Sequence, residues 1–352
     1  MIFTLLLACL AEPSEVDEDE DVPVGTALIK PAELDPKWAG AVCNDGTPFG
    51  LSVRTGESDT WVIRVAGGYL CDDNIAPCSE REKRLTTTPK PMDLPDEGLF
   101  SRDPVVNPSF HAANQVELHY CSSDLWLGVQ GERTETTGSP DGWFFAGRAN
   151  MRAALEVLAE RHGLDDASGA TEVLVVGSSA GGMGVTGNLD LLQEKLGKTR
   201  ERGKLKVILD GAWVPPWDLE KTPKANRWGP LLQSCERDRT EAKKDLLSCV
   251  FGPVWYPYYA KAGVPVLIQQ SALDTTQLRA YKIKGKGPLG VWKENAKASF
   301  EGVDWLYSGG FRYHIVAFGP KFSAGQQEQT FREVVDAFWA GGEPQRVLFR
   351  YE

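Results

Sequence analysis

The sequence lacks long apolar runs and an excess of positive charge. No stretch of its 352 residues approaches the roughly 18–20 apolar residues that a membrane-spanning helix needs. Lys and Arg number 38 against 49 Asp and Glu, which gives a formal net charge of -11. This balance argues against nucleic acid and against anionic lipid as partners, because both attract positive charge. With 42% hydrophobic and 25% charged residues, the composition is that of an ordinary globular protein.

Closely spaced metal ligands are also missing. There is no Cys-x-x-Cys pair and the chain has only four histidines, so a zinc site is not expected. The acidic run between Glu15 and Asp21 is interpreted as a solvated spacer rather than a metal site, because like charges repel and stay extended. We expect neither a metal nor an organic cofactor.

The N-terminus ends its short apolar run at Leu6-Leu7-Ala8-Cys9, which resembles the lipobox of a bacterial lipoprotein signal. In such signals the cysteine becomes the lipidated first residue, so Cys9 is the candidate lipid anchor to a membrane. A plain cleaved secretory signal and a chance match are the alternatives, because no Lys or Arg precedes the run. We predict a signal-like segment at 1–9, an acidic spacer at 10–36, and a single catalytic domain at 37–352.

Six further cysteines support an extracytoplasmic location. An even number in an exported chain predicts three disulfides, whereas six independent buried thiols are the alternative. The six are Cys43, Cys71, Cys78, Cys121, Cys235 and Cys249.

Short β-branched runs alternate with amphipathic helical patterns. The runs lie at 61–65, 116–120, 173–176, 207–209 and 266–268. Helical spacing of apolar residues occurs at 151–160 and 326–340. This alternation predicts an α/β protein with a mainly parallel sheet and helices on both faces, in which sites form at the carboxyl ends of the strands.

A G-x-S-x-G segment follows the third of these runs. It places Ser179 between Gly177 and Gly181, after a strand and before a helix predicted to reach about residue 195. This context is that of a nucleophile on a sharp turn, where the residues two before and two after must be small. The backbone N–H of Ala180 would then face an oxyanion. The alternative is a turn that binds phosphate or another anion.

Chain order reduces the candidates for the catalytic base. In the α/β-hydrolase fold the order is nucleophile, acid, histidine. His111, His119 and His162 precede Ser179, which leaves His314. Without the motif, His314 would be read as an ordinary structural histidine, and His119 is predicted to be structural because it lies in a strand-like run.

Two carboxylates can serve as the acid. Asp274 follows the run at 266–268 and Asp210 follows the run at 207–209. Either would hold the histidine in the right tautomer. The paired glycines Gly67 and Gly68 follow the first run and resemble an oxyanion loop, although a tight turn has the same composition.

Several segments together resemble the pectin acetylesterase and Notum family of carboxylesterases over residues 40–320. The matching segments are Cys43-Asn44-Asp45-Gly46, Gly67-Gly68-Tyr69-Leu70-Cys71, Tyr120-Cys121-Ser122-Ser123-Asp124-Leu125-Trp126, Gly177 to Asn188, and Leu273-Asp274 with Gln277-Leu278. The family's second motif usually carries Trp where this chain has Tyr69. The region around His314 matches least, so its assignment rests on chain order.

The resemblance implies an α/β-hydrolase-like fold and a set of site residues. It implies a triad of Ser179, Asp274 and His314. It implies disulfides Cys43–Cys121 and Cys71–Cys78, which leaves Cys235–Cys249. The oxyanion donors would be Gly68, Tyr69 and Ala180, and the pocket would include Trp126, Val250 and Phe251. Val250 stands where the family has an aromatic residue, so the pocket is not expected to favour a long acyl chain.

We expect a monomeric serine carboxylesterase that hydrolyses small acyl esters, with acetyl groups on extracellular polysaccharide as the first hypothesis. The second hypothesis is removal of a longer acyl chain from a lipidated protein or a lipid. The third, from another class, is a surface-binding module with an inactive site.

Overall fold

The computed structural model describes residues 25–71, 78–81, 83–88, 93–129, 134–136, 139–166, 171–216, 232–244, 246–309, 312–323 and 329–348. The signal-like segment with Cys9 and most of the acidic spacer lie outside the described residues. The strands are β1 (Ala27–Ile29), β2 (Leu51–Arg54), β3 (Thr60–Val65), β4 (Asn114–Leu118), β5 (Thr134–Thr136), β6 (Ser139–Trp143), β7 (Glu172–Ser178), β8 (Leu205–Asp210), β9 (Val266–Gln269), β10 (Trp305–Ser308) and β11 (Arg346–Leu348). The α-helices are α1 (Pro31–Leu34), α2 (Gly147–His162), α3 (Ala180–Gly187), α4 (Leu189–Lys195), α5 (Gly197–Glu201), α6 (Gln233–Glu241), α7 (Gly252–Ala262), α8 (Thr275–Ala280), α9 (Lys286–Ser299) and α10 (Phe331–Trp339).

A large mixed sheet organises the described part of the chain. Its strand order is β1-β2-β4-β3-β7-β8-β9-β10-β11. Within this sheet, the strands from β4 through β3 to β11 are all paired in parallel. The two antiparallel pairs of the sheet are β1 with β2 and β2 with β4. The predicted α/β class with a mainly parallel sheet is therefore confirmed. Because the central strands are parallel, the carboxyl ends of β3, β7, β8 and β9 meet at one edge of the sheet.

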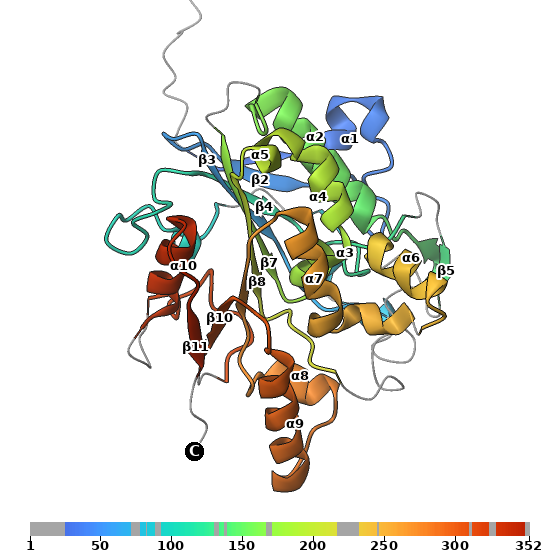
Figure 1. Cartoon of the computed structure of the whole chain (residues 1–352). Helices are drawn as coiled ribbons and strands as arrows, with labels where there is room; N and C mark the ends of the chain where they lie inside the picture. Colours follow the sequence, from blue (N-terminus) through green and yellow to red (C-terminus); the bar gives the residue numbers. More distant parts are fainter. Residues whose placement is uncertain are drawn as a thin grey trace, which may run out of the picture.

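Two apolar cores cover the two faces of this sheet. Along β7, Val173 and Val175 belong to one core, whereas Leu174 and Val176 belong to the other. This alternation follows from the two-residue period of a strand, and it explains why β7 is apolar at each of the positions 173–176. Helices α2, α4 and α7 lie over one face and α10 over the other (Figure 1).

All five predicted strands exist, with one boundary to correct. The strand predicted at 116–120 ends at Leu118, although the backbone N–H of His119 still donates to the carbonyl of Gly50 (3.3 Å), the next position in the β2–β4 register. The other four runs lie inside β3, β7, β8 and β9. The predicted spacer also ends earlier than residue 36, since Ala27–Ile29 pairs with β2 at the edge of the sheet.

The predicted helices form with different ends. The helix after Ser179 breaks at Asn188, which separates α3 from α4. The Asn188 side chain donates to the carbonyls of Trp126 (2.8 Å) and Gly184 (2.9 Å), so a distant segment sets the break. The helix predicted at 326–340 begins only at Phe331, because Thr330 forms a capping box with Glu333.

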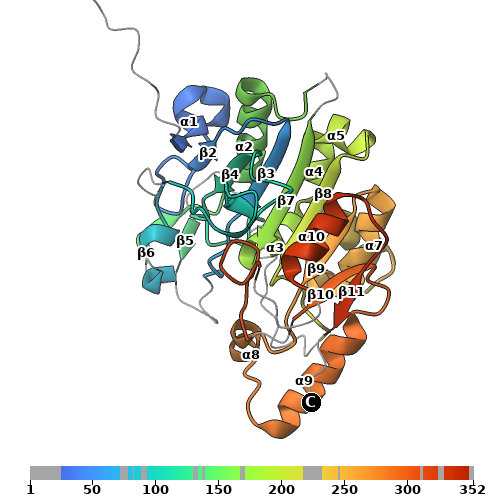
Figure 2. The same ribbon diagram turned by 90° about the vertical axis from the view of Figure 1, so that its left-hand side faces the viewer.

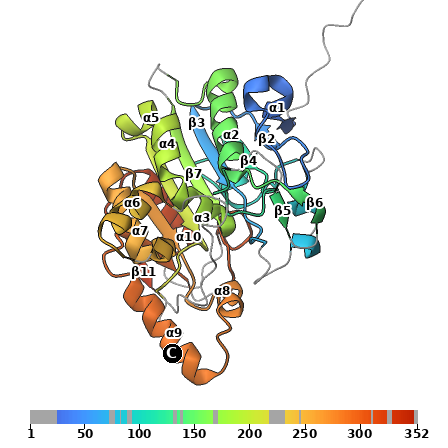
Figure 3. The same ribbon diagram turned by 90° about the vertical axis from the view of Figure 1, so that its right-hand side faces the viewer.

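Helices α8 and α9 extend beyond the carboxyl-end edge of the sheet (Figures 2 and 3). Helix α8 starts directly after Asp274, which accepts hydrogen bonds from the N–H groups of Thr276 and Gln277 as its N-cap. The position of Asp274 is therefore tied to the start of α8.

Three disulfides link the described residues: Cys43–Cys121, Cys71–Cys78 and Cys235–Cys249. These are the pairs implied by the family resemblance. No described helix is both long enough and apolar enough to span a lipid bilayer.

Candidate active site

Ser179 lies on a sharp turn between β7 and α3. Its φ of 55° is in the left-handed region, which is uncommon for a residue with a Cβ. A Cβ added to Gly181 would lie 1.9 Å from the Val65 carbonyl oxygen, and one added to Gly177 would lie 2.6 Å from the Gly182 Cα. The two glycines of the motif therefore make room for two contacts, one with the end of β3 and one within the turn itself.

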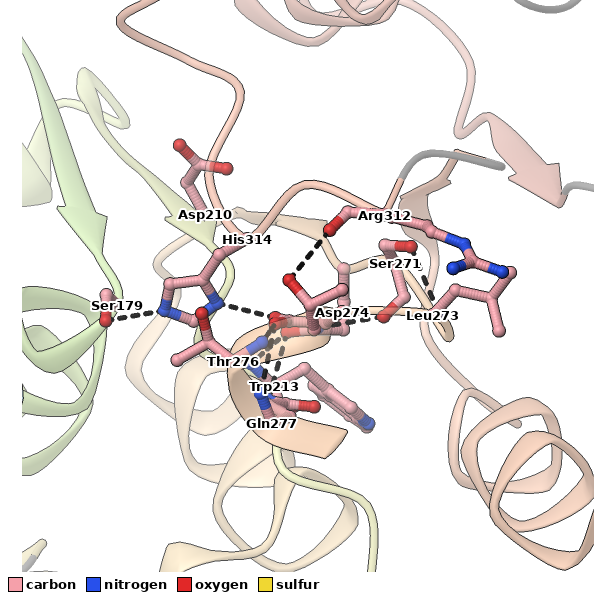
Figure 4. A network of polar contacts seen from close by, with 12 residues as sticks. Ser179, Asp210, Trp213, Ser271, Leu273, Asp274, Thr276, Gln277, Arg312 and His314 are labelled. Atoms are coloured by element: carbon pink, nitrogen blue, oxygen red, sulfur yellow. Dashed lines mark hydrogen bonds and ion pairs between the residues drawn. The ribbon is translucent and has the colours of Figure 1, made fainter. Parts of the chain in front are cut away.

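His314 lies between Ser179 and Asp274. Its Nε2 is 2.6 Å from Ser179 Oγ, and its Nδ1 is 2.6 Å from Asp274 Oδ2 (Figure 4). The imidazole is partly accessible, with 20% of the side chain exposed, whereas Asp274 is fully buried. Such an arrangement can pass a proton from a serine hydroxyl to the imidazole while the carboxylate holds the other ring nitrogen.

Asp274 is held by a set of hydrogen-bond donors. Besides the N–H groups of Thr276 (2.8 Å) and Gln277 (3.1 Å), the Gln270 side chain donates to Oδ2 (3.0 Å). These donors fix the orientation of the carboxylate towards the imidazole. Gln270 is a site residue that sequence patterns did not indicate, since an amide at the end of a strand has no local signature.

Asp210, the other candidate acid, does not contact the imidazole. Its carboxylate points away from the ring (Figure 4) and accepts backbone hydrogen bonds from Val316 and Ala317. Of the two acids that the local pattern left open, the structure thus brings only Asp274, the acid implied by the family resemblance, to His314. The Asp210 carboxyl is fully buried, and this burial raises its pKa to about 6, although the two N–H donors act in the opposite direction.

The three candidate oxyanion donors come from two segments that adjoin Ser179. A Cβ on Gly67 would lie 2.8 Å from the Ser179 Cβ, so the loop after β3 runs directly beside the nucleophile. Tyr69 has a φ of 65° in this loop. Within the described part of the chain, the backbone N–H groups of Gly68, Tyr69 and Ala180 donate to no other residue. They are therefore available to a substrate oxygen.

A mainly apolar cavity of about 100 Å³ opens beside Ser179. Its apolar lining includes Leu70, Leu125, Met183, Val214, Val250 and Tyr281. Of the three predicted pocket residues, Val250 lines this cavity, whereas Trp126 and Phe251 do not. Trp126 is fully buried beneath it, where its Nε1 donates to the Ala66 carbonyl (2.9 Å), and its neighbour Leu125 takes the lining position.

The remaining histidines lie elsewhere. His119 is buried and its Nε2 is 2.8 Å from Ser52 Oγ, as its predicted structural role requires, and burial lowers its pKa. His111 contacts the Pro108 carbonyl (3.1 Å), and His162 ends α2. No cluster of three or more possible metal ligands occurs among the residues that the structure describes.

A family model described as Pectinacetylesterase matches residues 18–335. The palmitoleoyl-protein carboxylesterase NOTUM of Drosophila melanogaster is 35% identical over 258 residues, which cover 67% of this chain and 36% of the relative. The human protein of the same name is 29% identical over 259 residues, which cover 67% of this chain and 49% of the relative. The chain therefore spans about a third to a half of these curated relatives.

A solved structure described as the Wnt deacylase Notum from Drosophila has the same fold. Its crystal form II matches with a TM-score of 0.74 and 25% sequence identity. The match covers 89% of this chain and 94% of that chain.

Proposed function

Because this chain belongs to the pectinacetylesterase family, we propose that it is an extracytoplasmic carboxylesterase that uses Ser179 as its nucleophile. The observation that carries this proposal is the line of contacts from Asp274 through His314 to Ser179, with 2.6 Å at each step. The three disulfides support an oxidising compartment, because such bonds persist there and are rare in the cytosol.

The reaction proceeds through an acyl-enzyme. Ser179 Oγ attacks the ester carbonyl carbon while its proton moves to His314 Nε2. The carbonyl oxygen becomes an oxyanion near the backbone N–H groups of Gly68, Tyr69 and Ala180. Asp274 stabilises the imidazolium. The imidazolium then gives its proton to the departing alcohol, and water, deprotonated by His314, releases the carboxylic acid.

The proposed substrate is a small acyl ester, with O-acetyl groups on polysaccharide as the first candidate. The description of the matching family supports this choice. The chemistry needs the three triad side chains, the three backbone N–H groups and water, and it needs no cofactor.

The cavity beside Ser179 favours a second candidate, a longer acyl group. Its volume of about 100 Å³ exceeds what the methyl of an acetyl group fills, since a group of that size occupies about 30 Å³, like a water molecule. The relatives named as palmitoleoyl-protein carboxylesterases point in the same direction. A protein or lipid carrying such a chain is then the partner.

A panel of p-nitrophenyl esters, assayed on matched variants, tests both the nucleophile and the preferred acyl chain length. Ser179→Ala should lower turnover by several orders of magnitude, because triad members act as a unit. Ser178→Ala is the matched control, since the Ser178 hydroxyl is buried and makes no hydrogen bond within the described part of the chain. Full activity in Ser179→Ala would refute Ser179 as the nucleophile, whereas a wild-type protein that hydrolyses none of the esters would favour a binding module. A preference for octanoate over acetate would reject the acetyl candidate.

A further proposal concerns the N-terminus. We propose that Cys9 carries a lipid anchor, and mass spectrometry of the mature N-terminus tests this: an unmodified or absent Cys9 would contradict it.

We also propose that the enzyme acts as a monomer, because each group of the reaction comes from one chain. Light scattering on the purified protein measures its mass directly.

A further inference from the structure

Asp210 is connected to both reacting partners of the site. Its backbone carbonyl accepts the N–H of Ser179 (2.9 Å). Its carboxylate accepts the N–H of Val316, at 3.0 Å from each oxygen, and the N–H of Ala317 (2.9 Å). One residue at the end of β8 therefore holds the nucleophile through its main chain and the segment after His314 through its side chain.

The segment that carries His314 belongs to no helix or strand. Besides the two contacts of the imidazole, the Arg312 carbonyl accepts a hydrogen bond from Thr275 Oγ1 (3.1 Å) and the Ala317 carbonyl accepts one from the Leu99 N–H (2.9 Å). Gly211, the residue after Asp210, also packs closely against this segment. A Cβ on Gly211 would lie 2.2 Å from the His314 carbonyl oxygen.

We propose that Asp210 is a positioning residue for the reaction: its ionised carboxylate fixes the segment of His314 against the backbone of Ser179 and so sets the distance between base and nucleophile. This inference rests on the proposed function. It assigns Asp210 a role different from that of the acid Asp274, because Asp210 acts on the main chain of the histidine segment and not on the imidazole.

The surroundings of Asp210 make its charge variable. Burial raises the pKa of this carboxyl to about 6, whereas the N–H groups of Ala317 and Val316 and the neighbouring His314 and Arg64 lower it. Arg64 is itself paired with Glu117 (2.7 Å). The residues beside Asp210 in the sheet register, Ser178 and Gln269, are neutral. Ionisation strengthens the hydrogen bonds to Val316 and Ala317, since charge-assisted bonds are about twice as strong as neutral ones.

The variant Asp210→Asn tests the role. Its amide has the same size but presents one acceptor and no charge. We expect kcat to fall about tenfold to a hundredfold at pH 8, as small misplacements of reacting groups do, with KM nearly unchanged because Asp210 does not line the cavity. At pH 5 the ratio of wild-type to variant kcat should be smaller, because the wild-type carboxyl is then largely protonated.

Asp124→Asn is the matched control. Asp124 is equally buried, burial also raises its pKa to about 6, and it accepts backbone N–H bonds, but from Trp126, Gly128 and Gly147. Its kcat should stay near wild type at both pH values once folding is verified by circular dichroism. A pH-independent ratio for Asp210→Asn, a rise in KM alone, or the same kcat loss in the control would overturn the inference. If instead Ser179→Ala remains active, the proposed function itself is wrong.

A measurement on the wild type applies even where Asp210→Asn does not fold. Amide hydrogen exchange of the peptide containing Val316 and Ala317, corrected for the intrinsic pH dependence, should show greater protection at pH 8 than at pH 5. Equal protection at the two pH values would contradict the role of the ionised carboxylate.

Discussion

At the scale of single residues, Asp274 has two roles that substitutions can separate. It contacts His314 Nδ1 and it is also the N-cap of α8. Asparagine caps helices about as well as aspartate, but it cannot stabilise an imidazolium with a negative charge. The charge and the cap therefore predict different results for two replacements of the same residue.

We predict that Asp274→Asn lowers kcat by about 10³- to 10⁴-fold and leaves thermal stability nearly unchanged. Asp274→Ala should lose the same activity and, in addition, about 1 kcal/mol of unfolding free energy with the cap. Ester hydrolysis and thermal unfolding of both proteins provide the comparison. Equal stability of the two variants would show that the cap contributes nothing.

The residue scale also marks the limit of sequence analysis for this site. The motif and chain order were sufficient to select Ser179 and His314, and the structure brings these two side chains into contact. The choice between Asp210 and Asp274 could not be made locally, since each follows a buried strand. Side-chain direction and the course of the 312–317 segment decide it, and both depend on tertiary packing.

At the scale of elements, the turn between β7 and α3 has no spare volume at Gly181. We predict that Gly181→Ala abolishes activity and strongly destabilises the protein, because the new Cβ would collide with the Val65 carbonyl. Gly197→Ala is the matched control, since no atom lies within 4 Å of its Cβ position and it begins helix α5. That control should be neutral or more stable by up to about 1 kcal/mol. Urea unfolding and turnover measure both, and a well-folded, active Gly181→Ala would disprove the steric account.

Substitutions at the start of helix α10 should change the stability of the protein without changing its catalysis. Thr330 caps this helix through a capping box with Glu333, on the face of the sheet opposite to α2, α4 and α7. We predict that Thr330→Ala costs about 1 kcal/mol of unfolding free energy and leaves kcat and KM unchanged, whereas Thr330→Ser retains most of the stability. A loss of activity proportional to the loss of stability would show that α10 and the site are coupled.

Elements were predicted well where their own residues specify them. Runs rich in β-branched residues identified β3, β7, β8 and β9, because strands buried on both faces are apolar over most of their length. Strands such as β10 (Trp305–Ser308) and β2 (Leu51–Arg54) were not predicted, since each has only four residues and a pattern over so few positions is not distinctive. The break at Asn188 was missed for a different reason: it depends on the carbonyl of Trp126, far away in the sequence.

At the scale of the whole molecule, buried carboxyls make stability depend on pH. Burial raises the pKa of Asp124 to about 6, above the ordinary value of 3.8. The folded state then binds the proton more tightly than the unfolded state, so this stabilisation is complete below about pH 4 and is lost as the pH rises through about 6.

We therefore predict that the stability advantage of the wild type over Asp124→Asn shrinks between pH 4 and pH 7, by on the order of 2–3 kcal/mol. Urea unfolding of both proteins at several pH values, with the disulfides intact, measures this difference. A constant or growing advantage would mean that the Asp124 carboxyl ionises in the fold as readily as in water.

The placement of Ser179, Asp210 and Asp274 after three adjacent parallel strands has a consequence for refolding. Each of β7, β8 and β9 joins its neighbour only after a long crossover, and pairings between residues distant in the chain form slowly. Helices such as α2 need no such pairing to begin forming. Recovery of catalysis after denaturation should consequently lag behind recovery of helical circular dichroism. The rate at which catalysis returns would then report the rate at which β9 pairs with β8.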